Sequence, residues 1–332
     1  MPPRASIAVA AWALLVFGGS LLLFGAAAGG QDTPASIEPR LRFGPFRDEG
    51  VKIPTASFRV NSNLVLVPVN VLDVRNRQVL GLTREQFRVF DDDVEQPITH
   101  FATDDAPASI AIVLDASGSM GAKLNKSREA VADILNTANP DDEFALIQFN
   151  ARVQRLVDFT GRSGEILNGL LSIQSKGPTA LLDAVYFAIN TMRRARHPRK
   201  AIVLISDGGD NCSRYTVLET KQMVREADVQ IFALAIVDRI EKRGRTREEI
   251  EGPTLLDSIT EETGGRMFIV DKADELRAAA AEIGTTLRNQ YLLGYSTAET
   301  ARDGKFHSVA VNVHCNKSVR LFWRLGYYAA ER

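Results

Sequence analysis

The chain has 332 residues, of which 45% are hydrophobic and 24% are charged, a composition typical of globular proteins. This length is sufficient for one large domain together with a smaller one. Its 40 Lys and Arg residues are balanced by 41 Asp and Glu residues, giving a net charge of -1. This balance excludes the strongly basic surface expected of a protein that binds nucleic acid or an anionic membrane.

The first 30 residues have the features of an export signal. Arg4 precedes an uncharged apolar stretch at 7–24, and small residues at 26–28 fit a cleavage site. As an uncleaved helix, residues 7–28 would also nearly span a hydrocarbon core of about 30 Å. We therefore expect residues 1–30 to be a signal peptide or an N-terminal anchor, with the protein periplasmic, secreted or anchored on the outer side of a membrane.

Export places the chain where disulfides can persist, yet it has only two cysteines, Cys212 and Cys315. The stability of the fold therefore cannot depend on a disulfide framework. One bridge and two free thiols both remain open from the sequence.

A linker and a β segment are expected after residues 1–30. Residues 31–56 mix Pro, Gly and charged residues without a sustained period, which predicts a linker with little structure. Residues 57–105 contain short strand-like runs separated by polar turns, which predicts a β segment. In its first run, every second residue from 65 to 71 is Val, typical of a half-buried strand, and Pro68 predicts a position at the edge of a sheet.

Residues 106–290 alternate apolar strand-like runs with amphipathic helical stretches. The expected strands are 109–115, 144–150, 201–207, 230–237 and 266–270, with 153–159 as a hairpin partner of the second. The expected helices begin near Lys123, Gly164, Ala180, Thr216 and Thr254, and a last one covers 273–289. This alternation predicts an α/β domain with a doubly wound, mostly parallel sheet covered by helices on both faces.

The chain returns to a strand pattern at 291–332, where three apolar runs are separated by polar turns. Three or more strands with a shared apolar face are needed for independent stability, and neither flank alone meets this need comfortably. We therefore expect 291–332 to pack with 57–105 as a small β-sandwich.

Three oxygen-bearing side chains follow the first strand of the α/β region at alternate positions: Asp115, Ser117 and Ser119 in DASGS. Open parallel sheets bind ligands beyond the carboxyl ends of their strands, and this is such an end. Two further residues occupy matching positions, because Thr179 precedes a helix and Asp207 closes a later strand. We expect these five side chains to meet at one edge of the sheet.

In this order, the five residues resemble the metal-ion-dependent adhesion site of von Willebrand factor type A domains. The outer segments resemble exported bacterial proteins that carry this domain. The resemblance implies the Rossmann-like fold of that family and a divalent cation bound directly by Ser117, Ser119 and Thr179. It also implies that Asp115 and Asp207 act partly through water, which leaves a sixth position for an acidic side chain of a partner protein.

The chemistry of the side chains supports a metal site independently of this resemblance. All five residues offer hard oxygen and none offers sulfur or imidazole, which selects Mg2+, Ca2+ or Mn2+ over zinc or copper. The two carboxylates balance the charge of one divalent cation. The sequence therefore predicts Mg2+, or alternatively Ca2+ or Mn2+, as the cofactor.

Several of these residues also have an ordinary structural role open to them. The two serines can cap the helix that follows, and Asp207 can be a turn acid, although all five residues on one edge would rarely arise that way. Nearby, Asp183 is expected to be a helix N-terminal acid or a member of a buried network. Residues 210–211 are expected to shape the rim of the site.

Other chemistries fit the sequence poorly, because the four histidines lack zinc spacing and no nucleophile elbow or phosphate-binding loop is present. We predict a non-enzymatic, metal-dependent interaction or adhesion module of an exported protein. Its partner would be a protein presenting an acidic side chain, with no nucleic acid and with membrane contact only if the N-terminal segment is uncleaved. Two alternatives stay open: a metal-assisted hydrolase, which would need a general base near the metal, and a structural envelope module whose cation stiffens the loop.

Overall fold

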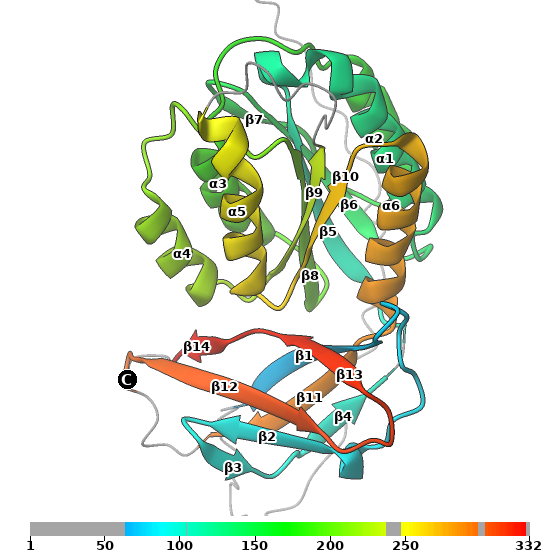
Figure 1. The fold of residues 1–332 in the computed structure, drawn as a ribbon, viewed down its shortest axis with the longest axis vertical. Coiled ribbons are helices and arrows are strands. Elements are labelled where there is room, and N and C mark those ends of the chain that lie inside the picture. Colours follow the sequence, from blue (N-terminus) through cyan, green and yellow to red (C-terminus); the bar gives the residue numbers. More distant parts are fainter. Residues whose placement is uncertain (1–63, 104, 237–246, 298–302, 330–332) are drawn as a thin grey trace, which may run out of the picture. The chain divides into compact units, whose positions relative to one another are not determined.

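The computed structural model describes residues 64–103, 105–236, 247–297 and 303–329 (Figure 1). The expected signal peptide or anchor (1–30) and the linker (31–56) lie outside the described residues, so both stay predictions. None of the helices that the structure describes combines the length and the apolar character needed to cross a membrane.

A six-stranded sheet forms the centre of the α/β region, with the strand order β10-β9-β8-β5-β6-β7. Its strands are β5 (Ala108–Asp115), β6 (Glu143–Phe149), β7 (Val153–Thr160), β8 (Arg199–Ser206), β9 (Gln230–Ile236) and β10 (Met267–Val270). All neighbouring strands are parallel except β6 and β7, which form an antiparallel pair. The predicted doubly wound, mostly parallel sheet is therefore confirmed.

Helices cover both faces of this sheet (Figure 1). They are α1 (Leu124–Asn136), α2 (Ser163–Leu171), α3 (Leu181–Met192), α4 (Val217–Glu226), α5 (Arg247–Glu261) and α6 (Ala273–Arg288). Along β5, Ile110 and Ile112 join a core with residues of α1, α2 and α6, whereas Ala111 and Val113 join a second core with residues of α3, α4 and α5. Every residue of β5 is buried because successive side chains point into one core or the other.

Strands from both flanks of the α/β region pair in two four-stranded antiparallel sheets, of orders β13-β1-β11-β4 and β14-β12-β2-β3. The first has β1 (Leu64–Asp73), β4 (His100–Ala102), β11 (Tyr291–Ser296) and β13 (Val319–Trp323). The second has β2 (Phe87–Asp91), β3 (Val94–Gln96), β12 (Phe306–Val313) and β14 (Gly326–Tyr328). Their apolar faces share one core, so they form the expected sandwich.

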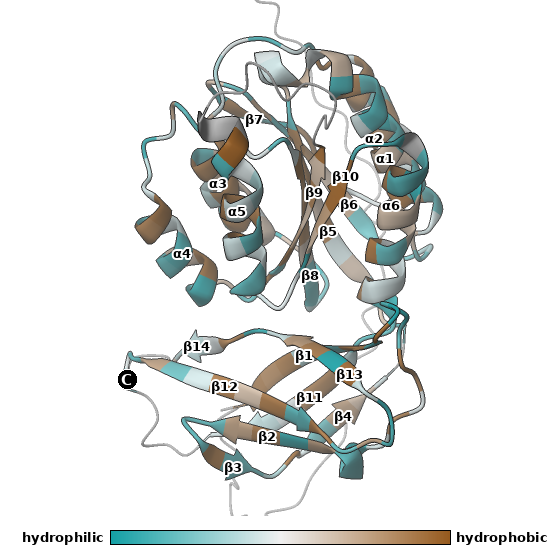
Figure 2. Ribbon diagram, in the orientation of Figure 1, coloured by the Kyte–Doolittle hydropathy of each residue, from teal (hydrophilic) through white to brown (hydrophobic). Residues whose placement is uncertain are grey.

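The colouring by hydropathy differs between the six-stranded sheet and the β-sandwich. Figure 2 shows mostly apolar colours on the strands of the six-stranded sheet, whereas the colour of β12 changes along its length. Along β12, Val309 and Val311 are buried in the sandwich core and Ala310 and Asn312 between them are exposed. A strand buried on one face needs apolar residues only at every second position.

Two local predictions were wrong. β1 lies inside its sheet, between β11 and β13, although Pro68 indicated an edge. Pro68 is tolerated because β13 pairs only with residues 69–73 of β1, so that side of β1 is not paired at the proline. The fifth helix begins at Arg247 and not near Thr254, because α5 continues through Pro253.

Candidate metal centre

The two predicted aspartates stand at the carboxyl ends of neighbouring parallel strands. Asp115 is the last residue of β5, and Asp207 directly follows β8. The register pairs Leu114 with Ile205, so Asp115 lies beside Ser206. The Ser206 hydroxyl donates to Asp115 Oδ2 over 2.6 Å and thereby fixes one oxygen of this buried carboxylate.

The two predicted serines follow β5, Ser117 in the loop and Ser119 within the short 3-10 helix at 118–123. Ser117 N donates to Asp115 Oδ1 over 2.8 Å, which folds the loop back over the aspartate. The hydroxyl oxygens of Ser117 and Ser119 are 3.1 Å apart. Ser117 precedes the 3-10 helix η2 (Gly118–Lys123), but its side chain makes no capping hydrogen bond to this helix. The capping role therefore does not account for the Ser117 hydroxyl.

The loop that carries Thr179 is bonded to both of the other loops. Gly177 O accepts from Gly118 N over 2.9 Å, which joins the Thr179 loop to the serine loop. Asn211 Oδ1 accepts from Thr179 N over 2.8 Å, and Asn211 N donates to Thr179 O over 3.0 Å, which joins it to the loop after Asp207. The structure thus brings together the three segments that the sequence placed at one edge of the sheet.

Two buried carboxylates lie at this edge of the sheet. Asp115 is fully buried and Asp207 is 4% exposed. Burial raises the pKa of Asp115 to about 6, and the nearby Asp207 charge adds to this rise against the opposing hydrogen bonds from Ser206 and Ser117. Asp207 Oδ1 is buried and has no hydrogen-bond partner. Buried polar oxygens are normally paired, so this atom fits a metal site.

Residues 110–209 match the family model of the von Willebrand factor type A domain. The α/β region contains a von Willebrand factor type A domain. Domains of this family typically mediate protein–protein interaction or adhesion.

Relatives of known name match part of the chain. The mouse inter alpha-trypsin inhibitor, heavy chain 4, is 31% identical over 146 residues, and the mouse inter-alpha-trypsin inhibitor heavy chain H2 is 28% identical over 149 residues. These matches cover 39% and 40% of this chain and 16% of each relative. The chain therefore spans about a sixth of the length of the relatives it matches.

Solved structures with a similar fold include two bacterial proteins. BatB from Bacteroides thetaiotaomicron is 20% identical with a TM-score of 0.44, over 55% of this chain and 98% of that one. The PilB minor pilin from Streptococcus sanguinis is 14% identical with a TM-score of 0.44, over 58% and 63% of the two chains. Similarities of this size carry no argument about function.

Lys123 is a further residue of the site, and the sequence analysis missed it. It ends η2, and its Nζ donates to Asp207 Oδ2 over 2.9 Å. The Lys123 side chain is 18% exposed and that of Asp207 is 4% exposed, so the ion pair is largely shielded from water. The sequence signal for this role was the position of Lys123, only four residues after Ser119 in the same short helix. Ser206 was also missed, although it precedes Asp207 at the same strand end.

The residues expected around the von Willebrand factor type A site have supporting roles. Asp183 lies in the first turn of α3, as one of its two expected roles requires, and it accepts from Arg214 N and from Arg214 Nε, each over 2.9 Å. Asp210 Oδ1 accepts from Leu181 N over 2.8 Å and from the Ser213 hydroxyl over 2.5 Å. These bonds tie the loop after Asp207 to the start of α3.

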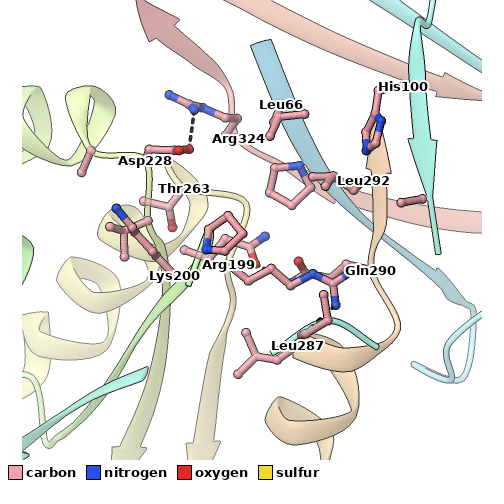
Figure 3. Close-up of a pocket in the computed structure, with 17 residues that line it drawn as sticks. Leu66, His100, Arg199, Lys200, Asp228, Thr263, Leu287, Gln290, Leu292 and Arg324 are labelled. Atoms are coloured by element: carbon pink, nitrogen blue, oxygen red, sulfur yellow. Dashed lines mark hydrogen bonds and ion pairs between the residues drawn. The ribbon is translucent and has the colours of Figure 1, made fainter. Parts of the chain in front are cut away.

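A cavity of about 230 Å³ lies at the other ends of the strands (Figure 3). It is lined in part by Arg199 and Gln230, the first residues of β8 and β9, and by Leu66 of β1. Asp228 and Arg324 form an ion pair of 2.9 Å on its wall. Because parallel strands have their carboxyl ends at one edge, this cavity is separate from the predicted metal ligands.

The two cysteines are free in this structure, so the stability of the fold includes no disulfide between them. Cys212 is exposed in the loop after Asp207, and Cys315 is partly exposed between β12 and β13. The Cys315 thiol donates to Lys317 O over 3.2 Å.

Proposed function

We propose that the von Willebrand factor type A domain binds a divalent cation and, through it, a carboxylate of a partner protein. The ligands would be Asp115, Ser117, Ser119, Thr179 and Asp207. The observation that carries this proposal is the pair of buried aspartates, of which Asp207 retains a buried oxygen without a hydrogen-bond partner. A cation between two such groups would remove the free-energy cost of burying like charges together.

The donor set favours a hard cation, and Mg2+ is the first candidate. Five oxygen ligands without sulfur or imidazole suit Mg2+, Ca2+ or Mn2+. When bound, the ion would supply a Lewis-acidic position for an incoming carboxylate. Ser206 and the Ser117 backbone orient Asp115, and the backbone bonds among the three loops hold the hydroxyl ligands in place.

Binding is favoured over hydrolysis because the site offers no neighbouring general base of the usual kind. In the described part of the chain, the side chains hydrogen-bonded to the five residues are those of Ser175, Ser206, Asn211 and Lys123, besides the two site serines themselves. A general base near neutral pH is most often a histidine. This arrangement supports an interaction or adhesion module and not an enzyme.

Export of the protein is a separate part of the proposal and rests on residues 1–30. Their apolar stretch and small residues fit a signal peptide or an anchor. Fractionation of cells that produce the protein, with mass spectrometry of its N-terminus, tests this. A chain retained inside the cell with an intact N-terminus would contradict export.

The metal site is tested by calorimetric titration of Mg2+ into the protein and into its Ser119→Ala variant. Ser119 is exposed, so its change removes one hydroxyl ligand with little effect on the core. Ser172→Ala is the matched control, because the Ser172 hydroxyl is also exposed but donates to Gly169 O. Mg2+ binding to the parent and the control, weakened in Ser119→Ala, supports the site, whereas a parent that binds neither Mg2+, Ca2+ nor Mn2+ refutes it.

The interaction itself is tested by Mg2+-dependent retention of partners from an envelope extract, with the parent compared with Asp115→Ala. Retention that EDTA abolishes and that Asp115→Ala lacks is expected. Retention that persists in EDTA would show a binding surface that does not use the cation.

A further inference from the structure

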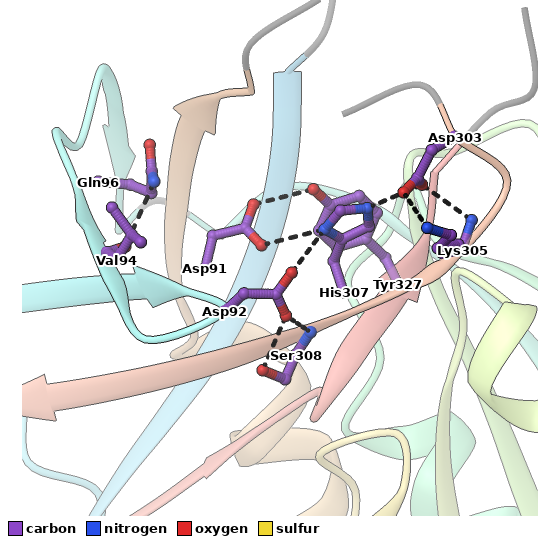
Figure 4. Close-up of polar contacts among 9 residues, drawn as sticks. All are labelled: Asp91, Asp92, Val94, Gln96, Asp303, Lys305, His307, Ser308 and Tyr327. Carbon is purple, nitrogen blue, oxygen red and sulfur yellow. Dashed lines mark hydrogen bonds and ion pairs between the residues drawn. The ribbon is translucent and has the colours of Figure 1, made fainter. Parts of the chain in front are cut away.

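A second group of metal-ligating side chains lies in the β-sandwich, on strands that the von Willebrand factor type A domain does not contain. Asp91 ends β2, Asp92 begins the turn to β3, and His307 is on β12 (Figure 4). β2 and β12 are antiparallel, with Val309 opposite Asp91, which places His307 beside the turn. We call Asp91, Asp92, His307 and the neighbouring Asp303 the His307 cluster.

The ligand atoms of three members are close enough to share one ion. One ligand atom from each of Asp91, Asp92 and His307 lies within 4.8 Å of the other two. His307 Nδ1 is 2.9 Å from Asp92 Oδ2 and 3.8 Å from Asp91 Oδ1. In a tetrahedral site with bonds of 2.0–2.1 Å, ligand atoms are about 3.3 Å apart. The two observed distances lie on either side of that value, so small side-chain movements would complete the geometry.

In Asp91 and in Asp92, the carboxylate oxygen that does not face His307 accepts a hydrogen bond that fixes the side chain. The Tyr327 hydroxyl donates to Asp91 Oδ2 over 2.9 Å, and Ser308 N donates to Asp92 Oδ1 over 2.8 Å (Figure 4). The remaining oxygens, Asp91 Oδ1 and Asp92 Oδ2, are the two that face His307. Groups that fix the orientation of the ligands in this way are a regular feature of protein metal sites.

The imidazole is oriented in the same manner. His307 Nε2 is 3.1 Å from Asp303 Oδ1, so a proton on Nε2 is shared with this carboxylate. Nδ1 faces the two other aspartates and is 2.9 Å from Asp92 Oδ2, so without a metal this contact needs a proton on Nδ1, and a metal ion would take the place of that proton. A carboxylate on the far nitrogen of a metal-binding histidine is the usual way to fix its tautomer.

A buried oxygen of Asp91 is a second, independent observation at the cluster. Asp91 is 9% exposed, and its Oδ1 has no hydrogen-bond partner. This oxygen faces the imidazole of His307. A buried carboxylate oxygen is normally hydrogen-bonded, because burial removes it from water. An ion between Asp91 Oδ1 and His307 Nδ1 would satisfy both atoms.

The charges of the cluster balance with a divalent ion. Its three carboxylates carry three negative charges, and Lys305 Nζ, 3.7 Å from Asp303 Oδ2, contributes one positive charge. A divalent cation with a neutral imidazole brings the sum to zero. A protonated imidazole alone would leave one negative charge without compensation. A divalent cation therefore fits the charges of the cluster.

We propose that Asp91, Asp92 and His307 bind a divalent transition-metal ion, with Asp303 as the residue that positions the imidazole. The donor set of two carboxylate oxygens and one imidazole nitrogen suits Zn2+ or Mn2+. It differs from the all-oxygen set of the first site, so the two sites prefer different ions. An ion here would join the β2–β3 turn to β12 and so link the N-terminal and C-terminal flanks of the chain.

The test is a titration of Zn2+ into the full chain in excess Mg2+, which fills the all-oxygen site. We expect one Zn2+ per chain, with an affinity that falls at least about tenfold in His307→Ala and in Asp303→Asn. His100→Ala is the matched control and should bind like the parent, because His100 is an exposed histidine on β4. Equal Zn2+ binding in His307→Ala and His100→Ala overturns the proposal.

A spectroscopic measurement on the parent protein tests the site without any variant. Co2+ in place of Zn2+ should give visible absorption bands that saturate at one ion per chain and disappear on addition of Zn2+. A parent that shows no such bands and no Zn2+ binding refutes the site. In that case, destabilisation by His307→Ala would indicate that the cluster is stabilised by a protonated His307 paired with the aspartates.

Discussion

Replacement of Lys123 by Met should tighten the binding of Mg2+ to the von Willebrand factor type A domain. The change keeps a long apolar side chain and removes one positive charge beside a predicted metal ligand. In the structure this charge is held by Asp207 at 2.9 Å, so Lys123 competes with any cation that needs the same carboxylate. The residue would set how strongly the site retains its metal.

The magnitude follows from the geometry of the pair. Two unit charges 2.9 Å apart attract by about 1.4 kcal/mol at the dielectric constant of water, and by several times more at the lower effective values of partly buried sites. Because 1.4 kcal/mol corresponds to a factor of ten in a binding constant, we expect the Mg2+ affinity to rise at least about tenfold. Without metal, the variant should be less stable by about 3–5 kcal/mol, the usual effect of removing one partner of a buried ion pair.

The assay combines calorimetric titration of Mg2+ with melting temperatures measured in EDTA and in saturating Mg2+. Lys126→Met is the matched control, because Lys126 lies on α1 directly after η2 and donates to Asp271 O over 3.0 Å, away from Asp207. In Lys123→Met the melting temperature should fall in EDTA and rise by more than that of the parent on addition of Mg2+. A variant that binds Mg2+ no better than the parent, while the parent does bind it, refutes the role of Lys123.

Further predictions concern the surroundings of the site. Gly252→Ala should destabilise the protein by about 1–3 kcal/mol and weaken Mg2+ binding, because its new Cβ would lie 2.6 Å from the Gly208 carbonyl carbon. Gly164→Ala, where no atom lies within 4 Å of the new Cβ, should leave melting temperature and Mg2+ titration unchanged or slightly improved. Asp183→Asn should lower stability at pH 7 by about 1–3 kcal/mol in denaturant titrations. Burial raises the Asp183 pKa, but hydrogen bonds from Arg214 and Tyr215 outweigh it and hold the pKa below its ordinary 3.8. The difference in stability between the variant and the parent should therefore shrink as the pH falls below about 4. A stability difference that stays constant over this pH range would contradict the prediction.

The α/β fold could be predicted because its signals are local. Strands buried on both faces are continuous apolar runs, and the helices between them carry a helical period. The errors arose where tertiary contacts outweigh local preference. Gly252 and Pro253 look like the start of a new element, yet α5 passes through them while Gly252 lies against the backbone of Gly208. No sequence pattern reports such a close approach of two backbones.

The two candidate metal sites differ in the same way. The first was predictable because the carboxyl ends of parallel strands meet at one edge whatever the details of packing. The His307 cluster depends on the pairing of β2 with β12, which joins residues more than two hundred positions apart. A register shift of one residue would turn His307 to the other face of its strand, so no local motif can encode the cluster. Because the two sites share no residue and no strand, Ser119→Ala should leave Zn2+ affinity unchanged and His307→Ala should leave Mg2+ affinity unchanged.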